Sequence, residues 1–209
     1  NPEDKVSVKA VDYAGNEATA NAGADLAYPS IHVLTPEALS VHNSKEVELS
    51  GYVTDANGME SLMIADREIA LAYNEETKRY EFKTTLAFEE DGVHEFTISG
   101  KSVNGKELSF NRTVIIDTAA PVLEVQGAPE TVGQSAADPV VSLKVEDNFD
   151  ELRVHLNGNE IFYQEFKEPF AMRSISKLIE GIELPLEEGS NEFEFTAVDY
   201  GGNTTTKMI

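Results

Sequence analysis

At 209 residues the chain is long enough for about two domains, and a hydrophobic content of 41% is sufficient to build folded cores. Its 38 acidic residues outnumber 16 basic ones and give a formal net charge of −22, which argues against nucleic acid or an anionic membrane surface as a partner. The absence of cysteine excludes disulfide frameworks, thiolate metal sites and thiol catalysis.

The first predicted element is a β-hairpin whose sequence recurs at the other end of the chain. Residues 8–16 read VKAVDYAGN and residues 195–203 read FTAVDYGGN, 187 positions apart (198 − 11). Each copy lies between an alternating segment and a threonine-containing one, as expected for the hairpin that closes a β-domain. We therefore predict that residues 1–27 are the C-terminal hairpin of a truncated preceding β-sandwich.

Two complete β-sandwich domains are predicted to follow, at residues 28–116 and 117–209. Their beginnings correspond, because residues 29–33 (PSIHV) resemble residues 121–125 (PVLEV) at an offset of 92 (121 − 29). The joint between them is the short segment 117–121 (DTAAP). Proline lacks an N–H donor and fixes its own φ, so it starts an edge strand and stiffens the joint.

The last predicted domain shows the strand pattern most clearly. Seven short segments are bounded by turn residues, and several of them alternate polar and apolar side chains: 122–125, 140–145, 152–156, 160–162, 181–186, 192–199 and 204–208. Asn157-Gly158 is typical of a type I′ hairpin turn, which needs positive φ at both positions. The fold class is therefore all-β, with tandem immunoglobulin-like or fibronectin III-like sandwiches.

One segment of this domain does not follow the strand pattern. Within residues 166–180, apolar side chains recur at helical spacing: Met172, Ile175, Leu178 and Ile179. This spacing predicts a short helix that crosses an edge of the sandwich.

Two further patterns carry a resemblance to a known family. Ala-x-Asp-x-Ala-Gly-Asn at residues 10–16, repeated with one change at 197–203, and Asp-Thr-x-x-Pro at 117–121 resemble the stalk repeats of bacterial surface proteins. Residues 152–158 (LRVHLNG) and 187–191 (EEGSN) look like the fibronectin-type modules that follow the protease domain in lactocepin-type cell-envelope subtilisin-like serine proteases.

The resemblance implies an extracellular accessory region at the cell wall of a Gram-positive bacterium. In that family the catalytic Asp, His and Ser belong to a separate domain, and no matching motif lies in this chain. The middle domain departs from the pattern, since Asn104 and Gly105 stand where the Asp-x-x-Gly-Asn turn is expected. Neighbouring domains of the same chain are the first expected partners, followed by a protein substrate or a host protein.

Catalytic motifs are absent from the sequence. It contains no Gly-x-Ser-x-Gly, no His-Glu-x-x-His and no glycine-rich phosphate loop, and its four histidines have no metal-ligand spacing. We therefore expect a non-catalytic spacer or substrate-presenting fragment. The alternative is an adhesin-type array that binds a ligand.

Acidic loops supply the candidate metal ligands. Asp147, Asp150 and Glu151 lie within five positions of one loop, and their crowded carboxylates repel one another unless solvent or a cofactor such as Ca²⁺ screens them. The two repeated turns are interpreted as structural, with a short Asp accepting backbone hydrogen bonds and a Gly supplying positive φ. The residues of these turns are Asp12, Gly15, Asn16, Asp199, Gly202 and Asn203.

Four aromatic residues crowd one region of the last domain: Phe162, Tyr163, Phe166 and Phe170. They are candidates for a patch that binds a sugar or peptide, with packing in the core as the alternative role.

Overall fold

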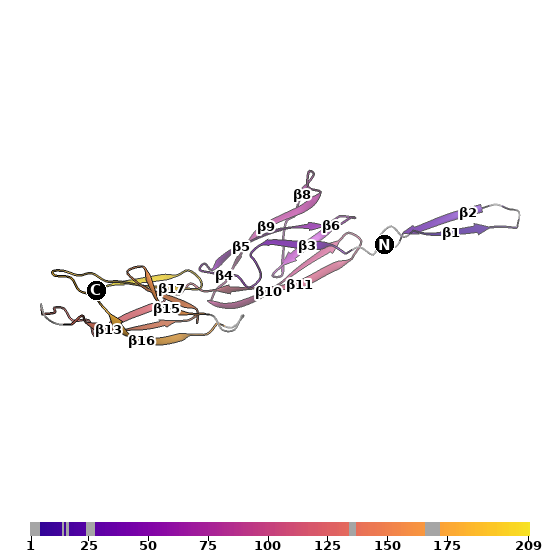
Figure 1. The fold of residues 1–209 in the computed structure, drawn as a ribbon. Coiled ribbons are helices and arrows are strands. Elements are labelled where there is room, and N and C mark those ends of the chain that lie inside the picture. The colour runs from indigo at the N-terminus through magenta and orange to yellow at the C-terminus, as the bar shows by residue number, and fades with distance from the viewer. Residues whose placement is uncertain (1–4, 14, 16, 24–27, 134–136, 166–171) are drawn as a thin grey trace. The chain divides into compact units, whose positions relative to one another are not determined.

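The computed structural model describes residues 5–13, 15, 17–23, 28–133, 137–165 and 172–209. In this part of the chain every regular element is a β-strand (Figure 1), so the predicted all-β class is confirmed. No helix that is long and apolar enough to cross a membrane occurs among these residues.

Internal contacts divide the chain into two compact units. The first unit comprises Asn1–Thr35, Glu48–Thr84 and Phe96–Arg112, and the second comprises Pro36–Val47, Thr85–Glu95 and Thr113–Ile209. We call residues 28–116 the middle segment and residues 117–209 the last segment. Because the middle segment contributes to both units, the predicted domain boundaries stay a prediction.

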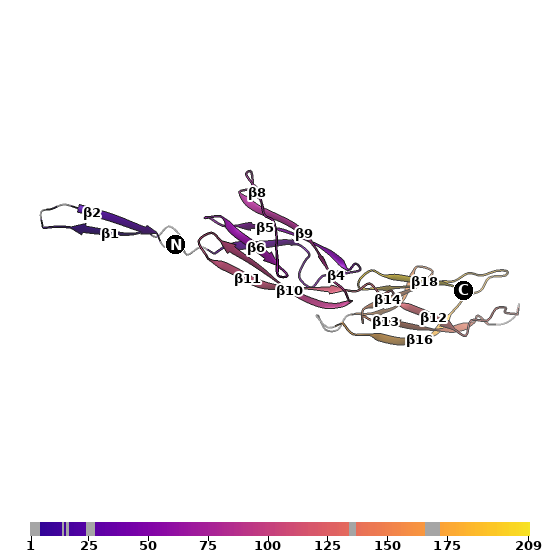
Figure 2. The ribbon, with the colours of Figure 1, turned by 180° about the vertical axis from the view of Figure 1, so that it is seen from behind.

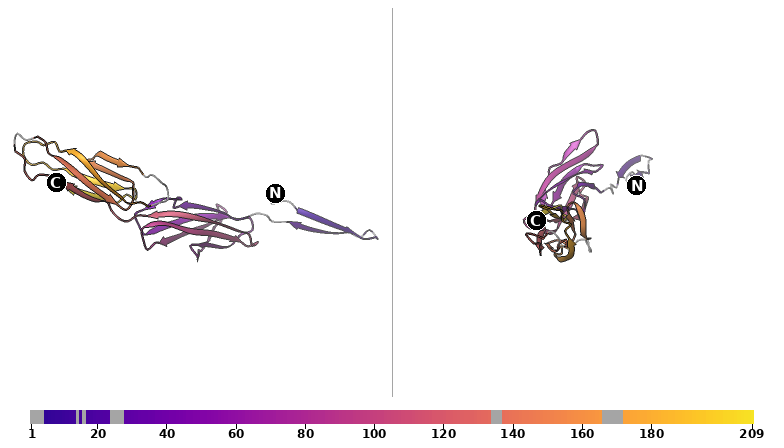
Figure 3. Two further views of the ribbon diagram at one scale, coloured as in Figure 1. Left: turned by 90° about the horizontal axis from the view of Figure 1, so that it is seen from below. Right: turned by 60° about the vertical axis from the view of Figure 1, so that its left-hand side comes forward.

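The strands β1 (Lys5–Val11) and β2 (Glu17–Gly23) form a two-stranded antiparallel sheet of their own (Figure 3, indigo). Val11 pairs with Glu17 at the turn, and Gly15 within the turn has a φ of 86°. The side chains of Val8 and Val11 are exposed. The hairpin expected from the sequence is present.

The middle segment contains two sheets. One has the order β3-β5-β9-β8 and the other has the order β4-β11-β10-β6-β7. The strands of the first are β3 (Ser30–Thr35), β5 (Glu46–Thr54), β8 (Ala72–Asn74) and β9 (Arg79–Ala87). Those of the second are β4 (Val41–His42), β6 (Met59–Ile64), β7 (Arg67–Glu68), β10 (Gly92–Ser102) and β11 (Glu107–Ile116).

Alternation of side chains explains why these sequences form strands with one buried face. In β5, every second residue from Val47 to Val53 is buried while its neighbours are more exposed, as the pleat of a strand requires. The pairing of β4 with β11 is parallel.

The described residues of the last segment form seven strands in two antiparallel sheets, with the orders β12-β13-β16 and β15-β14-β17-β18. The strands are β12 (Val122–Gln126), β13 (Val140–Asp147), β14 (Leu152–Leu156), β15 (Asn159–Gln164), β16 (Ile175–Glu183), β17 (Glu194–Asp199) and β18 (Thr204–Met208). Figure 2 shows β12, β13 and β16 together in one layer. Three strands in one sheet and four in the other is the arrangement of a fibronectin III-like sandwich.

The core of the last segment is contributed by both of its sheets. Its buried members are Val141, Leu143, Val145, Leu152, Val154, Ile175, Ile182, Leu184, Phe193, Phe195 and Ala197. They alternate with less buried residues along β13, β14 and β17, so burial of apolar area holds the two sheets together.

The predicted turn at Asn157 and Gly158 is confirmed. Their φ angles are 49° and 78°, and Leu156 pairs with Asn159 across the turn. The Asn157 side chain also accepts a hydrogen bond of 2.9 Å from the backbone N–H of Glu194, which ties the turn to the adjacent strand β17.

The predicted helix near residues 166–180 is wrong for its described part, because Ile175–Glu183 form the strand β16. Residues 166–171 lie outside the described residues. β16 pairs antiparallel with β13 and satisfies backbone groups that β13 would otherwise leave unpaired. The helical spacing of the apolar residues was coincidental, since Leu178 is 46% exposed while Ile175 and Ile182 are buried.

Candidate functional site

Three buried aspartates meet at one end of the last sandwich. Asp147 ends β13, Asp199 ends β17 and Asp117 directly follows β11. Each offers a carboxylate oxygen, and these three atoms lie within 4.8 Å of one another. All three residues belong to the second compact unit. We call them the aspartate cluster.

The backbone around Asp117 is held by hydrogen bonds on both sides. Its N–H donates to the carbonyl of His42 at 2.9 Å, and its own carbonyl accepts from the side-chain amide of Asn203 at 2.8 Å. The N–H and hydroxyl of Thr118 both donate to the carboxylate of Asp91, each at 2.9 Å. These contacts fix the backbone position from which the Asp117 side chain extends.

Asp199 is fixed by the turn that follows it. Its Oδ1 accepts from the N–H of Asn203 at 2.8 Å, and its Oδ2 accepts from the side-chain amide of the same residue at 2.9 Å. Gly202 has a φ of 85°, which a glycine adopts without steric cost. A Cβ on Gly201 would lie only 3.1 Å from the carbonyl oxygen of Asp117, so a glycine there permits the close approach of the two segments.

Most of the remaining carboxylate oxygens in the cluster have no hydrogen bond of good geometry. Oδ2 of Asp147 accepts from the N–H of Phe149 at 3.1 Å, but Oδ1 of Asp147 and both oxygens of Asp117 are buried without a hydrogen-bond partner of good geometry. The side-chain oxygen Oδ1 of Asn148 is also buried without such a partner. Within the described part of the chain, no lysine or arginine forms an ion pair with any of the three carboxylates.

Burial of these acids changes their protonation. Desolvation raises the pKa of Asp147 to about 7, with the charges of Asp117 and Asp199 adding to the rise and the hydrogen bond from Phe149 opposing it. Desolvation likewise raises the pKa of Asp117 to about 6, while the neighbouring Asn148 side chain lowers it and Asp199 raises it. Such raised pKa values are typical of buried carboxylates that no neighbouring positive charge compensates.

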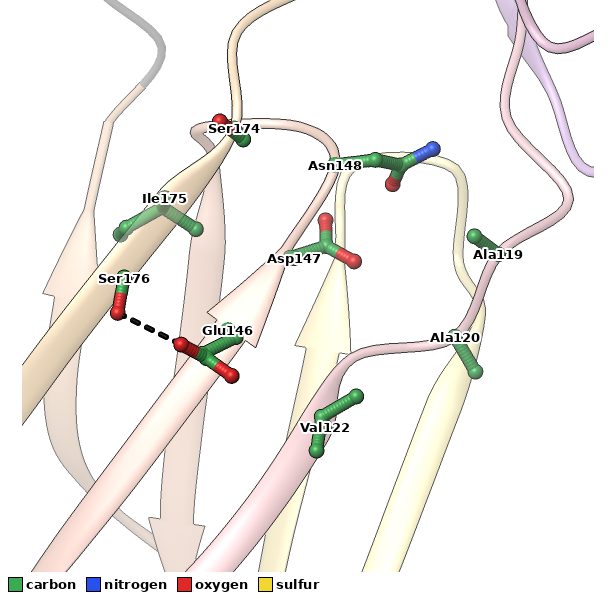
Figure 4. Close-up of a pocket in the computed structure, with 9 residues that line it drawn as sticks. All are labelled: Ala119, Ala120, Val122, Glu146, Asp147, Asn148, Ser174, Ile175 and Ser176. Atoms are coloured by element: carbon green, nitrogen blue, oxygen red, sulfur yellow. Dashed lines mark hydrogen bonds between the residues drawn. The ribbon is translucent and has the colours of Figure 1, made fainter.

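A pocket reaches the cluster from the surface. Asp147 and Asn148 line it together with residues of the joint, of β12 and β13, and of β16 and the position before it (Figure 4): Ala119, Ala120, Val122, Glu146, Ser174, Ile175 and Ser176. Ser176 donates a hydrogen bond of 2.9 Å to Glu146 on the pocket wall. The pocket gives solvent and small ions a path to Asp147.

The structure separates the three metal ligands expected from the sequence. Asp147 joins the aspartate cluster, whereas Asp150 and Glu151 are not members of it. Asp150 is buried, with Oδ1 lacking a partner, and Glu151 accepts a hydrogen bond of 3.5 Å from the hydroxyl of Tyr163. Sequence reasoning missed Asp117 as a candidate ligand, and the signal for it was its place as the first residue of the Asp-Thr-x-x-Pro joint.

The two repeated turns share one backbone hydrogen bond between equivalent described residues. The N–H of Gly15 donates to the carbonyl of Asp12 at 3.0 Å, and the N–H of Gly202 donates to the carbonyl of Asp199 at 3.3 Å. Asn16 lies outside the described residues. Of the two turns, the second is the one that contributes to the aspartate cluster.

The four aromatic residues proposed as a ligand patch do not form one described surface. Phe162 packs against the core, whereas Tyr163 is 40% exposed and lies under the guanidinium group of Arg153, 4.0 Å from the ring centroid. Consecutive residues of a strand face opposite sides. Phe166 and Phe170 lie outside the described residues.

The middle segment has a different arrangement at the position equivalent to the cluster. Asp55 follows β5 as Asp147 ends β13, and Ser102 ends β10 as Asp199 ends β17. The Ser102 hydroxyl donates to Oδ1 of Asp55 at 2.9 Å and lies 3.2 Å from the carbonyl of Gly58. A neutral donor therefore stands where the last segment has a third carboxylate.

Comparisons with known proteins concern the fold. No protein-family model and no curated protein match the chain. Among solved structures, the fibronectin(III)-like modules of CbhA from Clostridium thermocellum match with a TM-score of 0.46 and 12% identity, over 86% of this chain and 91% of that chain.

Two further matches are to longer chains, of which the matched part is half or less. Latent dimeric PorU from Porphyromonas gingivalis matches with a TM-score of 0.35 and 14% identity, over 98% of this chain but only 23% of its own. The Bacteroides ovatus protein SGBP-B, solved with a mixed-linkage heptasaccharide, matches with a TM-score of 0.29 and 13% identity, over 96% of this chain and 50% of its own. All three TM-scores lie below 0.5 and all three identities below 15%.

Proposed function

We propose that the chain is a non-catalytic spacer or substrate-presenting part of a secreted protein at a bacterial cell surface. In its finer form the proposal assigns the chain to the accessory region of a cell-wall-associated subtilisin-like serine protease of the lactocepin type. Residues 1–27, 28–116 and 117–209 are then three successive modules, the first represented by its closing hairpin.

The observation that carries the proposal is the repetition of one closing hairpin. β1 and β2 enclose a turn with Gly15 at a φ of 86°, and β17 and β18 enclose the same turn with Gly202 at a φ of 85°. Repetition of a structural turn, rather than of a reactive group, is typical of arrays that provide length and surface.

The polar contacts of the histidines also favour a structural role. Ser30 lies 3.0 Å from Nε2 of His32, and Ser40 lies 2.8 Å from Nε2 of His42. Each pair is formed by near neighbours in sequence, and in the described part of the chain no carboxylate orients either imidazole as a catalytic triad requires. Ser40 also donates to the carbonyl of Glu37 at 2.8 Å, which is a turn contact.

Single-molecule pulling tests the modular spacer directly. An unfolded chain extends about 3.3–3.6 Å per residue, so each of the two complete modules is expected to lengthen the chain by about 30 nm when it unfolds. Two separate steps of this size support the proposal. One combined step for residues 28–209 contradicts the modular division.

A second assay addresses function. The purified chain is expected to turn over no peptide or glycoside substrate and to bind no host protein or glycan saturably. Turnover of any such substrate contradicts the proposal. Saturable binding that Tyr163→Ala abolishes without changing the melting temperature would instead establish the adhesin alternative.

A further inference from the structure

We infer that Asp117, Asp147 and Asp199 bind one Ca²⁺ ion at the end of the last sandwich. The inference goes beyond the proposed function and does not depend on it, because a spacer does not require a metal. The ion would join the segment after β11 to the ends of β13 and β17, and so would fix the start of the last segment to its own sheets.

The first argument is the arrangement of charge. Three carboxylate oxygens lie within 4.8 Å of one another, and like charges this close repel strongly in a medium of low polarity. No arginine or lysine of the described residues pairs with them. A divalent cation supplies the missing positive charge.

The second argument is independent of the number of acids. Asp117 is fully buried, with 0% exposure, and neither of its carboxylate oxygens has a hydrogen bond of good geometry, although the side chain of Asn148 is close enough to lower its pKa. A buried polar group without a partner costs roughly 1–3 kcal/mol, and more when it is charged, so its persistence calls for a ligand. Oδ1 of Asp147 is likewise buried without a hydrogen-bond partner.

The surroundings provide neutral oxygen and a route for the ion. Oδ1 of Asn148 is buried without a partner, and a side-chain amide oxygen is a common Ca²⁺ ligand. Asp147 and Asn148 also line the surface pocket (Figure 4). An ion and the waters that complete its shell therefore have an entry path.

The middle segment serves as an internal comparison. There Ser102 donates a hydrogen bond of 2.9 Å to Oδ1 of Asp55, and the backbone N–H of Asn57 donates to the same oxygen at 2.8 Å, so this carboxylate has neutral donors although its Oδ2 is buried without a partner. The last segment has Asp199 at that position, which removes the donor and adds a negative charge. This exchange converts a loop closed by a hydrogen bond into one suited to a cation.

The ligand types select Ca²⁺ among the common metals. Every available donor is an oxygen, whereas structural zinc is usually held by cysteine or histidine. Ca²⁺ takes six to eight oxygen ligands in flexible geometry, while Mg²⁺ requires a near-ideal octahedron and keeps much of its water. Three carboxylates from separate segments with a nearby amide suit the larger ion.

Calorimetric titration of the whole chain with CaCl₂, after dialysis against EGTA, tests the inference. One ion per chain is expected, and at about 100 times the dissociation constant the last segment should melt roughly 10–20 °C higher than in EGTA. Asp117→Asn and Asp147→Asn should each weaken binding at least about tenfold. Circular dichroism in EGTA verifies that both variants fold.

The matched control is Asp55→Asn, which alters the equivalent residue of the middle segment and should leave Ca²⁺ binding unchanged. Absence of binding, or binding that survives Asp147→Asn because it involves other surface acids, overturns the inference. An equal thermal shift with MgCl₂ at the same concentration overturns the choice of Ca²⁺. None of these outcomes bears on the spacer role, which the pulling and turnover assays test separately.

Discussion

The side-chain amide of Asn203 donates a hydrogen bond of 2.8 Å to the backbone carbonyl of Asp117, although the two residues are 86 positions apart. The same amide donates to Oδ2 of Asp199 at 2.9 Å. One asparagine thus links the start of the last segment to the turn near its end. The aspartate cluster depends on this link, because it sets the position of two of the three acids.

Replacing that asparagine should loosen both segments. Asn203→Ala removes the two side-chain hydrogen bonds, and because one of them is to a charged group we expect a loss of about 2 kcal/mol in the free energy of unfolding. Urea unfolding in EGTA measures it through the midpoint. Asn159→Ala, which truncates an exposed asparagine, should change the midpoint little, and equal effects for the two variants would contradict the role of the link.

The closing turn should be sensitive to a side chain at Gly202. Its φ of 85° lies in the left-handed region, so Gly202→Ala is expected to lower the free energy of unfolding by about 1 kcal/mol or more. Thermal unfolding followed by circular dichroism gives the shift. Gly133→Ala is the control, since Gly133 has open space around it and no positive φ, and an unchanged Gly202→Ala variant would show that the turn tolerates strain.

Without metal, the cluster should make stability depend on pH. The pKa of Asp147 is raised to about 7 in the folded chain from about 3.9 when unfolded, so folding takes up a proton between these values. The stability this provides is present at low pH and is lost as the pH rises through about 7. The pKa of Asp117 is also raised, to about 6, so its contribution to stability is likewise lost as the pH rises. Among the neighbouring acids, Asp199 raises the pKa of both residues and Asp91 raises that of Asp117.

The measurement compares wild type with Asp147→Asn in EGTA. The variant has no charge to lose at this position, so it should gain stability relative to wild type as the pH rises from 5 to 8. Surface pairs such as Lys144 with Glu146 are present in both proteins and cancel in the difference. A difference in melting temperature that stays constant with pH would mean that Asp147 titrates normally.

The loop of the middle segment offers the reverse change. Ser102→Asp removes the hydroxyl that donates to Asp55 and places a second carboxylate beside it, which should lower the free energy of unfolding by roughly 1–3 kcal/mol in EGTA. Added Ca²⁺ should restore part of that loss. Ser102→Ala loses the donor without adding charge, so its destabilisation should not respond to Ca²⁺, and equal responses of the two variants would refute this explanation.

Much of the strand pattern could be predicted from local sequence. The segments expected at residues 152–156 and 204–208 coincide with β14 and β18, and the turn at Asn157 and Gly158 has the positive φ angles that were expected. Alternation of side chains and turn chemistry are properties of neighbouring residues, so they can be recognised in the sequence without knowledge of the fold. The helix near residue 175 was wrong because pairing with β13 outweighed the spacing of apolar residues.

The sequence by itself determined the all-β class, the repeated closing turn and the presence of an acidic loop at Asp147. Only the tertiary structure decided which acids meet there, since Asp150, three positions away, is left out of the cluster while Asp117 and Asp199 are brought in from distant parts of the chain. Strand formation follows from contacts between near neighbours. A site built from the ends of separate strands depends instead on sheet order and on long-range hydrogen bonds such as that between Asn203 and Asp117.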